Sequence, residues 1–226
     1  MSAPTLICCS HGTDSPEGRS TISRLVAAAA RAIGDVPVRE TYVDVQHPQV
    51  DEVVAATPGD AVVVPLLLSP GFHTSVDIGR AARSRPGVVA TDTLGPHPLL
   101  ADILAERVAA LRPAPGDAVV LAASGSSRPE AAESVERVRD AVAERLGRPV
   151  GVGYAYGATP KVAEAVADAR RAGAGRVIVA SYVLAPGHFA RLVAGAGADA
   201  TTAPLGDDPR VAEIVAERYR AGCQLL

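Results

Sequence analysis

The stretch Ala61-Val-Val-Val-Pro-Leu-Leu-Leu-Ser-Pro-Gly-Phe-His73 decides the fold class. Its first eight residues are apolar, which predicts a strand over residues 61–68 that is buried on both faces, as in a parallel sheet covered by helices. Ser69-Pro70-Gly71 should end this strand, because proline cannot continue a ladder and glycine allows a sharp exit. Ligands bind beyond the carboxyl ends of parallel strands, so His73 is a candidate ligand or base.

The same arrangement occurs again in Val177-Ile-Val-Ala-Ser-Tyr-Val-Leu-Ala-Pro-Gly-His188. The fifteen-residue segments that begin at Leu94 and Leu205 are identical at eight positions. This internal duplication, with strands and helices alternating, predicts an α/β protein of two similar domains. Each domain is expected to be a four-stranded parallel sheet flanked by helices. The predicted domains are residues 1–113 and 117–226, joined by the proline-rich linker 112–117.

Local patterns place the individual elements. Ser15 and Pro16 should begin the first helix and Gly34 should end it. Strands are predicted at residues 5–9, 36–44, 61–68, 88–92, 118–122, 150–156 and 176–184. Further helices are predicted after Pro48, at residues 74–83, 98–111, 129–146 and 160–172, after His188, and at residues 209–221.

Composition excludes several classes of function. The net charge is −3, aromatic residues make up 3% of the chain and tryptophan is absent, so we expect no nucleic-acid partner. The apolar runs are too short to cross a bilayer, and the N-terminus shows no leader pattern, so we expect no membrane partner and a cytoplasmic location. The three cysteines have neither zinc-site spacing nor a disulfide pattern.

Residues suited to metal chemistry are concentrated in the first repeat. Four of them align with less versatile residues in the second: His11 with Ser124, Asp44 with Tyr156, His47 with Thr159 and His73 with Phe189. His11, Asp44 and His73 each follow a predicted strand, so we expect them to converge at one sheet edge, in a single cleft between the halves. Imidazole and carboxylate suit divalent iron, cobalt, nickel or zinc, and histidine also accepts a proton near neutral pH.

Three segments resemble the sirohydrochlorin chelatase family, of the CbiX/SirB type among class II chelatases, in its long duplicated form. They are Ser10-His-Gly-Thr13, Tyr42-Val-Asp-Val-Gln-His-Pro48 and Pro65-Leu-Leu-Leu-Ser-Pro-Gly-Phe-His73. The resemblance implies insertion of Fe²⁺ or Co²⁺ into sirohydrochlorin, for siroheme or cobalamin biosynthesis, without ATP or another cofactor. It also implies that His11 and His73 bind the metal and accept protons. Asp44 stands where the family commonly has glutamate.

The substrate carries eight carboxylates, so hydrogen-bond donors and arginines near strand exits are candidate binding residues. They are Ser10, Thr13, Arg19, Arg80, Ser124, Ser126 and His188. Two halves in one chain would allow a monomer to form the site. His47 and His97 adjoin prolines and are interpreted as turn and helix-start residues.

Two other functions stay open on the sequence. A metallochaperone or tetrapyrrole carrier would use the same cleft without turnover. A hydrolase or phosphatase would use His11, but the sequence lacks a nucleophile elbow and the arginine that accompanies a phosphate-accepting histidine. The residues do not distinguish iron from cobalt.

Overall fold

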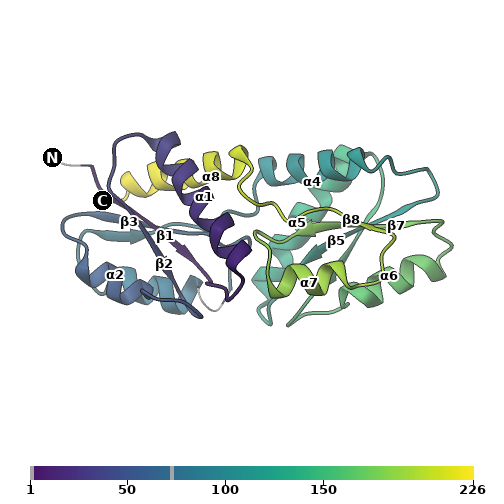
Figure 1. The fold of residues 1–226 in the computed structure, drawn as a ribbon, viewed down its shortest axis with the longest axis horizontal. Coiled ribbons are helices and arrows are strands. Elements are labelled where there is room, and N and C mark those ends of the chain that lie inside the picture. Colours follow the sequence, from purple (N-terminus) through teal and green to yellow (C-terminus); the bar gives the residue numbers. More distant parts are fainter. Residues whose placement is uncertain (1–2, 72–73) are drawn as a thin grey trace. The chain divides into compact units, whose positions relative to one another are not determined.

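The computed structural model describes residues 3–71 and 74–226 of the chain. They form two units, each built around its own four-stranded, all-parallel sheet, with strand orders β2-β1-β3-β4 and β6-β5-β7-β8 (Figure 1). The predicted fold class is therefore confirmed. The first unit comprises residues 1–94 and 207–226, and the second comprises residues 95–206.

The first unit alternates strands and helices until its last helix. Its elements are β1 (Thr5–Ser10), α1 (Pro16–Ile33), β2 (Val38–Tyr42), α2 (Val50–Ala56), β3 (Ala61–Pro65), the π-helix η1 (Thr74–Ile78), α3 (Gly79–Arg83), β4 (Val88–Ala90) and α8 (Pro209–Cys223). β1 and β3 lie in the middle of the sheet and are buried along their whole length, as their apolar sequences predict. Ser15 accepts a hydrogen bond from the Gly18 amide and caps α1, and Gly34 ends that helix, both as predicted.

The second unit repeats this order. Its elements are α4 (Pro98–Ala110), β5 (Ala118–Ala123), α5 (Pro129–Leu146), β6 (Val150–Tyr154), α6 (Val162–Arg171), β7 (Val177–Tyr182), α7 (His188–Ala194) and β8 (Ala200–Thr201). Helices α4 and α5 pack against each other, and α6 and α7 contribute to a core with β5 and β7. The fourth strand of this sheet, β8, has only two residues, and the sequence patterns assigned no residues to it.

Helices α4 and α8 each pack in the unit to which the preceding strand does not belong. Helix α4 follows β4 of the first unit but packs on α5 and β7 of the second, and α8 follows β8 but packs on α1 and β3 of the first. An arginine at the same position of the repeat anchors each helix in its unit. Arg107 on α4 donates to the Leu205 carbonyl at 2.9 Å, and Arg218 on α8 donates to the Thr93 carbonyl at 2.9 Å. The units thus exchange their last helices.

This exchange differs from the predicted division of the chain at residues 112–117. Those residues lie inside the second unit, where Arg176 donates to the Leu111 carbonyl at 2.8 Å and Arg148 to the Ala114 carbonyl at 3.0 Å. The segment is therefore a fixed turn of that unit. The chain passes between the units at residues 94–95 and 206–207 instead.

Strand β3 is shorter than predicted. It ends at Pro65, three residues before the predicted end, and the last residue pair of its ladder with β1 is Cys9 with Pro65. The Leu66 amide still donates to the Cys9 carbonyl at 2.7 Å. The Ser-Pro-Gly stretch therefore lies in the loop after the strand.

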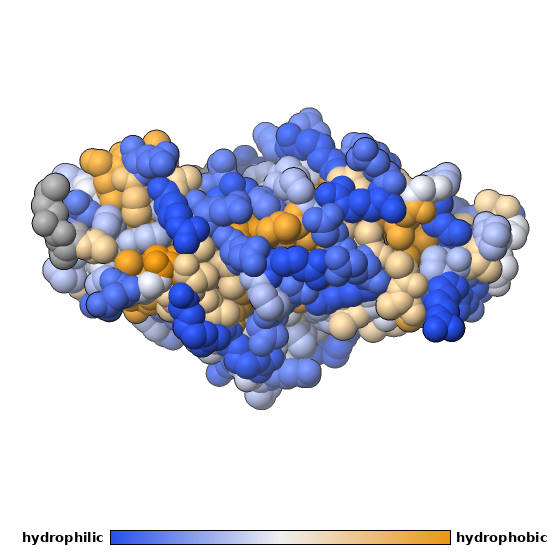
Figure 2. All heavy atoms as spheres, turned by 90° about the horizontal axis from the view of Figure 1, so that it is seen from above, coloured by the Kyte–Doolittle hydropathy of each residue, from blue (hydrophilic) through white to orange (hydrophobic). Residues whose placement is uncertain are grey.

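Polar residues cover much of the face shown in Figure 2, where hydrophobic residues form separate smaller patches. None of the helices in the described part of the chain is long and apolar enough to cross a membrane.

Candidate functional site

The loops that follow β1 and β2 meet at the carboxyl end of the first sheet. The Val43 amide donates to the Ser10 carbonyl at 3.0 Å, and the Asp44 amide donates to the His11 carbonyl at 3.1 Å. These bonds extend the parallel ladder past the last strand residues. They bring the main chains of His11 and Asp44 together, as expected for residues that follow neighbouring parallel strands.

Gly12 permits this close approach. Its φ is +90°, and a Cβ atom added there would overlap the Asp44 carbonyl oxygen. Only glycine combines a left-handed backbone with the absence of that atom. The glycine after His11 is therefore needed for the packing of the two loops.

The β2 loop contains a residue that sequence reasoning did not single out. Val45 has a φ of +57°, in the left-handed region that costs a β-branched residue roughly 1–2 kcal/mol. The neighbouring Asp44 carboxylate accepts a hydrogen bond from the Val45 amide at 2.8 Å. The sequence has no glycine or asparagine at this position, so it gave no signal of a left-handed turn.

Gln46 was also missed, and it joins the two loops through its side chain. Its Oε1 accepts a hydrogen bond from the Thr13 amide at 2.8 Å, and its own amide donates to the Asp44 carbonyl at 2.5 Å. Only its place within the Tyr42–Pro48 segment pointed to it. Gln46 thereby fixes the His11 loop to the Asp44 turn at a second point.

The substrate-binding candidates near His11 occupy different environments. Arg19 is exposed, and its Nε donates to the Thr13 carbonyl at 2.8 Å. Thr13 Oγ1 accepts from the Ser15 amide at 3.1 Å. Ser10 is buried, and its hydroxyl has no hydrogen-bond partner among the described residues. Arg19 and Thr13 therefore help to hold the loop, and their contact with a substrate stays a prediction.

The side chains of the two described metal candidates are accessible. His11 is half-buried, with Nδ1 3.4 Å from the Gly12 carbonyl oxygen, and Asp44 is exposed. His73 lies outside the described residues, so its predicted convergence with His11 stays a prediction. Among the described residues, no three His, Cys, Asp or Glu side chains are grouped as metal ligands.

Two other polar residues, His47 and Arg80, lie beside acidic partners, whereas two cysteines near the site are buried. His47 is exposed, with Nδ1 3.7 Å from Glu52 Oε2, consistent with its interpretation as a turn residue. Arg80, on α3, has its guanidinium Nη2 atom 3.7 Å from the Asp77 Oδ1 atom. Cys8 and Cys9 are buried in β1, and burial raises the pKa of the Cys8 thiol to about 12 and that of Cys9 further. Both side chains are fully buried within β1, so neither is exposed to an incoming metal ion.

The second unit repeats the same loop geometry with different side chains. The Tyr156 amide donates to the Ser124 carbonyl at 2.8 Å, which reproduces the Asp44–His11 bond. Gly125 has a φ of +86° and packs against the Tyr156 carbonyl, as Gly12 does against Asp44. Ser126 Oγ accepts from the Arg128 amide at 3.2 Å. His188 begins α7 and is exposed, with its ring against Phe189.

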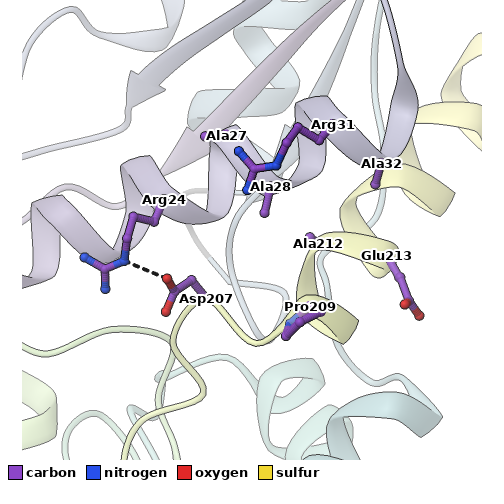
Figure 3. Close-up of a pocket in the computed structure, with 9 residues that line it drawn as sticks. All are labelled: Arg24, Ala27, Ala28, Arg31, Ala32, Asp207, Pro209, Ala212 and Glu213. Atoms are coloured by element: carbon purple, nitrogen blue, oxygen red, sulfur yellow. Dashed lines mark hydrogen bonds and ion pairs between the residues drawn. The ribbon is translucent and has the colours of Figure 1, made fainter.

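Two pockets lie away from these loops. One, of about 450 Å³, lies between α1 and α8, where Arg24 pairs with Asp207 at 2.6 Å (Figure 3). The other, of about 780 Å³, lies between β6 and α6 of the second unit, above Gly151. Of the predicted site residues that the structure describes, none lines either pocket.

Comparison with known proteins identifies the family. The model of the CbiX family matches residues 5–111 and again residues 118–221, so each repeat matches it separately. The chain belongs to the CbiX family. A sirohydrochlorin cobaltochelatase of Methanothermobacter thermautotrophicus is 28% identical over 129 residues, which are 46% of this chain and 90% of the relative. One of Methanosarcina acetivorans is 27% identical over 94 residues, 40% of this chain and 67% of the relative.

Solved structures share the whole fold of this CbiX-family chain. SirB from Bacillus subtilis with Fe³⁺ superposes with a TM-score of 0.79 at 19% identity, over 98% of this chain and 96% of that one. The CbiX described as the terminal enzyme of siroheme biosynthesis in denitrifying bacteria gives a TM-score of 0.70 at 21% identity, over 96% and 98% of the two chains. The duplicated architecture is thus shared along essentially the full length.

Proposed function

We propose that this protein inserts a divalent metal, Fe²⁺ or Co²⁺, into sirohydrochlorin without ATP. The observation that carries the proposal is the match of both repeats to the CbiX family, together with the family's Ser-His-Gly-Thr segment at the exit of β1. The cobaltochelatase names of the two archaeal relatives support cobalt, and the iron-bound SirB structure supports iron. Metal and tetrapyrrole are both substrates.

In the proposed mechanism, His11 and His73 bind the incoming metal and accept the two pyrrole protons that leave the ring. Asp44 adds a carboxylate that replaces water around the metal. The hydrogen bonds from Asp44 to the His11 carbonyl and from Thr13 to Gln46 favour this role, because they hold the two loops in one geometry. Arg19, Arg80, Ser10, Thr13, Ser124, Ser126 and His188 remain candidates for binding the substrate carboxylates.

The test is an anaerobic insertion assay. Purified protein, sirohydrochlorin and either Fe²⁺ or Co²⁺ are mixed, and the visible spectrum is followed against a mixture without protein. Many turnovers per chain are expected, and the faster metal identifies the physiological product. A spectral change that stops at one equivalent would instead identify a carrier, and the proposed catalysis would be wrong.

His11→Ala and His47→Ala form a matched pair within this test. Both replace a histidine in the β1 and β2 loops, but His47 lies against Glu52 and has no proposed role in the reaction. We expect His11→Ala to lower kcat/KM by at least about 100-fold, within the usual range for loss of a proton acceptor, and His47→Ala to retain wild-type rates. Equal rates for wild type and His11→Ala would remove His11 from the mechanism.

A further inference from the structure

Val45 combines two features that the fold itself does not require. It has a left-handed backbone, with φ +57°, and its apolar side chain is 52% exposed. A β-branched residue is unfavourable in this backbone region, and the exposed isopropyl group contributes little to the core. Strain of this kind is retained mainly at functional sites.

The same turn of the second unit has glycine in place of valine, and a Cβ atom there would meet the Ser126 main chain at 2.9 Å. The residue that corresponds to Val45 is Gly157, with a φ of +70°, and the bond from its preceding residue to Ser124 matches the bond from Asp44 to His11. Glycine adopts this backbone without strain. The turn therefore folds with glycine in the unit that lacks the histidine and carboxylate, and carries valine in the unit that has them.

The surroundings hold Val45 firmly in place. Its amide donates to the Asp44 carboxylate at 2.8 Å, and the next residue, Gln46, binds both the Asp44 carbonyl and the Thr13 amide. Thr13 belongs to the His11 loop. The isopropyl group is therefore displayed at a fixed position next in sequence to Asp44, in a turn bonded directly to His11.

We propose that Val45 contacts the apolar ring of the tetrapyrrole substrate. An isopropyl group can bind neither a metal ion nor a carboxylate, so its ligand must offer an apolar surface. Within the proposed reaction, which this inference depends on, only the conjugated macrocycle offers such a surface, because the metal is an ion and the substituents carry the acids. Val45 is thus a specificity residue that helps to place the ring over His11 and Asp44.

The test measures binding separately from metal insertion. Metal-free sirohydrochlorin is titrated anaerobically into wild type, Val45→Gly, Val45→Asn and Val45→Ile, with binding followed by absorbance and unfolding by urea. Glycine and asparagine tolerate the left-handed backbone, so we expect unchanged or higher urea midpoints but about tenfold weaker binding, as for loss of one buried valine side chain. Val45→Ile keeps an apolar group and should bind as wild type does.

Leu225→Asn is the control, because it removes an apolar group near the C-terminus that is more exposed than Val45, 68% against 52%. It should bind sirohydrochlorin as wild type does. Unchanged affinity in Val45→Gly and Val45→Asn would overturn the assignment, as would weaker binding accompanied by lower urea midpoints in both. If the wild-type protein binds no sirohydrochlorin, the proposed function fails and this inference fails with it.

Discussion

At the scale of single residues, the contact between Gly12 and Asp44 gives a direct prediction. Gly12→Ala should lower the free energy of unfolding by about 1–3 kcal/mol more than Gly173→Ala. Both glycines have similar positive φ, +90° and +94°, so both substitutions carry the same backbone cost. Only at Gly12 does the new methyl group overlap another atom, the Asp44 carbonyl oxygen, because nothing lies within 4 Å of the corresponding position at Gly173. Urea unfolding of the two variants measures the difference, and equal losses would contradict the packing described.

Tyr42 gives a prediction about pH. Burial and the hydrogen bond that its hydroxyl donates to Glu40, at 2.8 Å, raise the pKa of this tyrosine from 10.0 to about 12. Between these values the unfolded chain loses the proton and the folded protein keeps it, so stability should fall as the pH rises through this window. In Tyr42→Phe the free energy of unfolding should fall less steeply as the pH rises above 10. Urea midpoints at pH 8, 10 and 11 for the two proteins provide the measurement, and identical slopes above pH 10 would contradict it.

The sequence predicted part of the site at this scale. His11 and Asp44 were expected to lie together because both follow neighbouring parallel strands, and the main-chain bond between them agrees. Val45 and Gln46 were not found, because a left-handed valine contradicts local preference and a side-chain bond between two loops has no periodicity. Tertiary contacts, rather than local sequence, determine both features.

At the scale of elements, helix α8 lies unusually close to the first sheet. A Cβ atom at Gly222 would overlap the Val62 side chain on β3. Gly222→Ala should therefore destabilise the protein by about 1–3 kcal/mol, even though alanine favours a helix by about 1 kcal/mol over glycine.

Val62→Ala supplies the control for this contact. It removes both Val62 methyl groups that the new Cβ would meet and leaves only the Thr91 methyl, at 2.9 Å, so the double variant should be more stable than the sum of the two single effects predicts. Urea unfolding of the four proteins completes the cycle. Strictly additive losses in the free energy of unfolding would show that the contact with Val62 is not the cause of the destabilisation.

Sequence patterns located most elements but were weaker at their ends. The run of apolar residues after Pro65 was included in β3, because apolar character alone does not distinguish a ladder residue from a buried loop residue. Leu66 illustrates this, since it is buried and yet lies beyond the strand. No residues were assigned to strand β8, because two residues are too few to show an alternation of apolar and polar side chains.

At the scale of the whole molecule, the exchange of α4 and α8 predicts which fragments fold. Residues 95–206 contain every element of the second unit and should unfold cooperatively in isolation. Residues 117–226, a complete sequence repeat, lack α4 and carry α8 without its partners α1 and β3, so they should be poorly folded or self-associated. Circular dichroism with urea unfolding and gel filtration distinguish the two fragments, and the opposite ranking would contradict the exchange.

The exchange was not predictable from the repeat. The α4 and α8 segments share eight of fifteen aligned residues, including the arginines 107 and 218, so the sequence alone does not show on which sheet each helix packs. Sequence similarity therefore marks residues 112–117 as a boundary, although the structure has the chain pass between units elsewhere. The decisive contacts join residues more than ninety positions apart, such as Arg107 with Leu205 and Arg218 with Thr93.

The placement of α8 also reverses the order in which the units can be completed during synthesis. Domains usually complete folding on the ribosome in the order in which they are translated. Here the first unit needs α8, Pro209–Cys223, which follows every element of the second unit along the chain. The second unit ends at residue 206, so it can finish while α1 and β3 still await the helix that packs on them. The unit that carries His11 and Asp44 is begun before the second unit and completed after it.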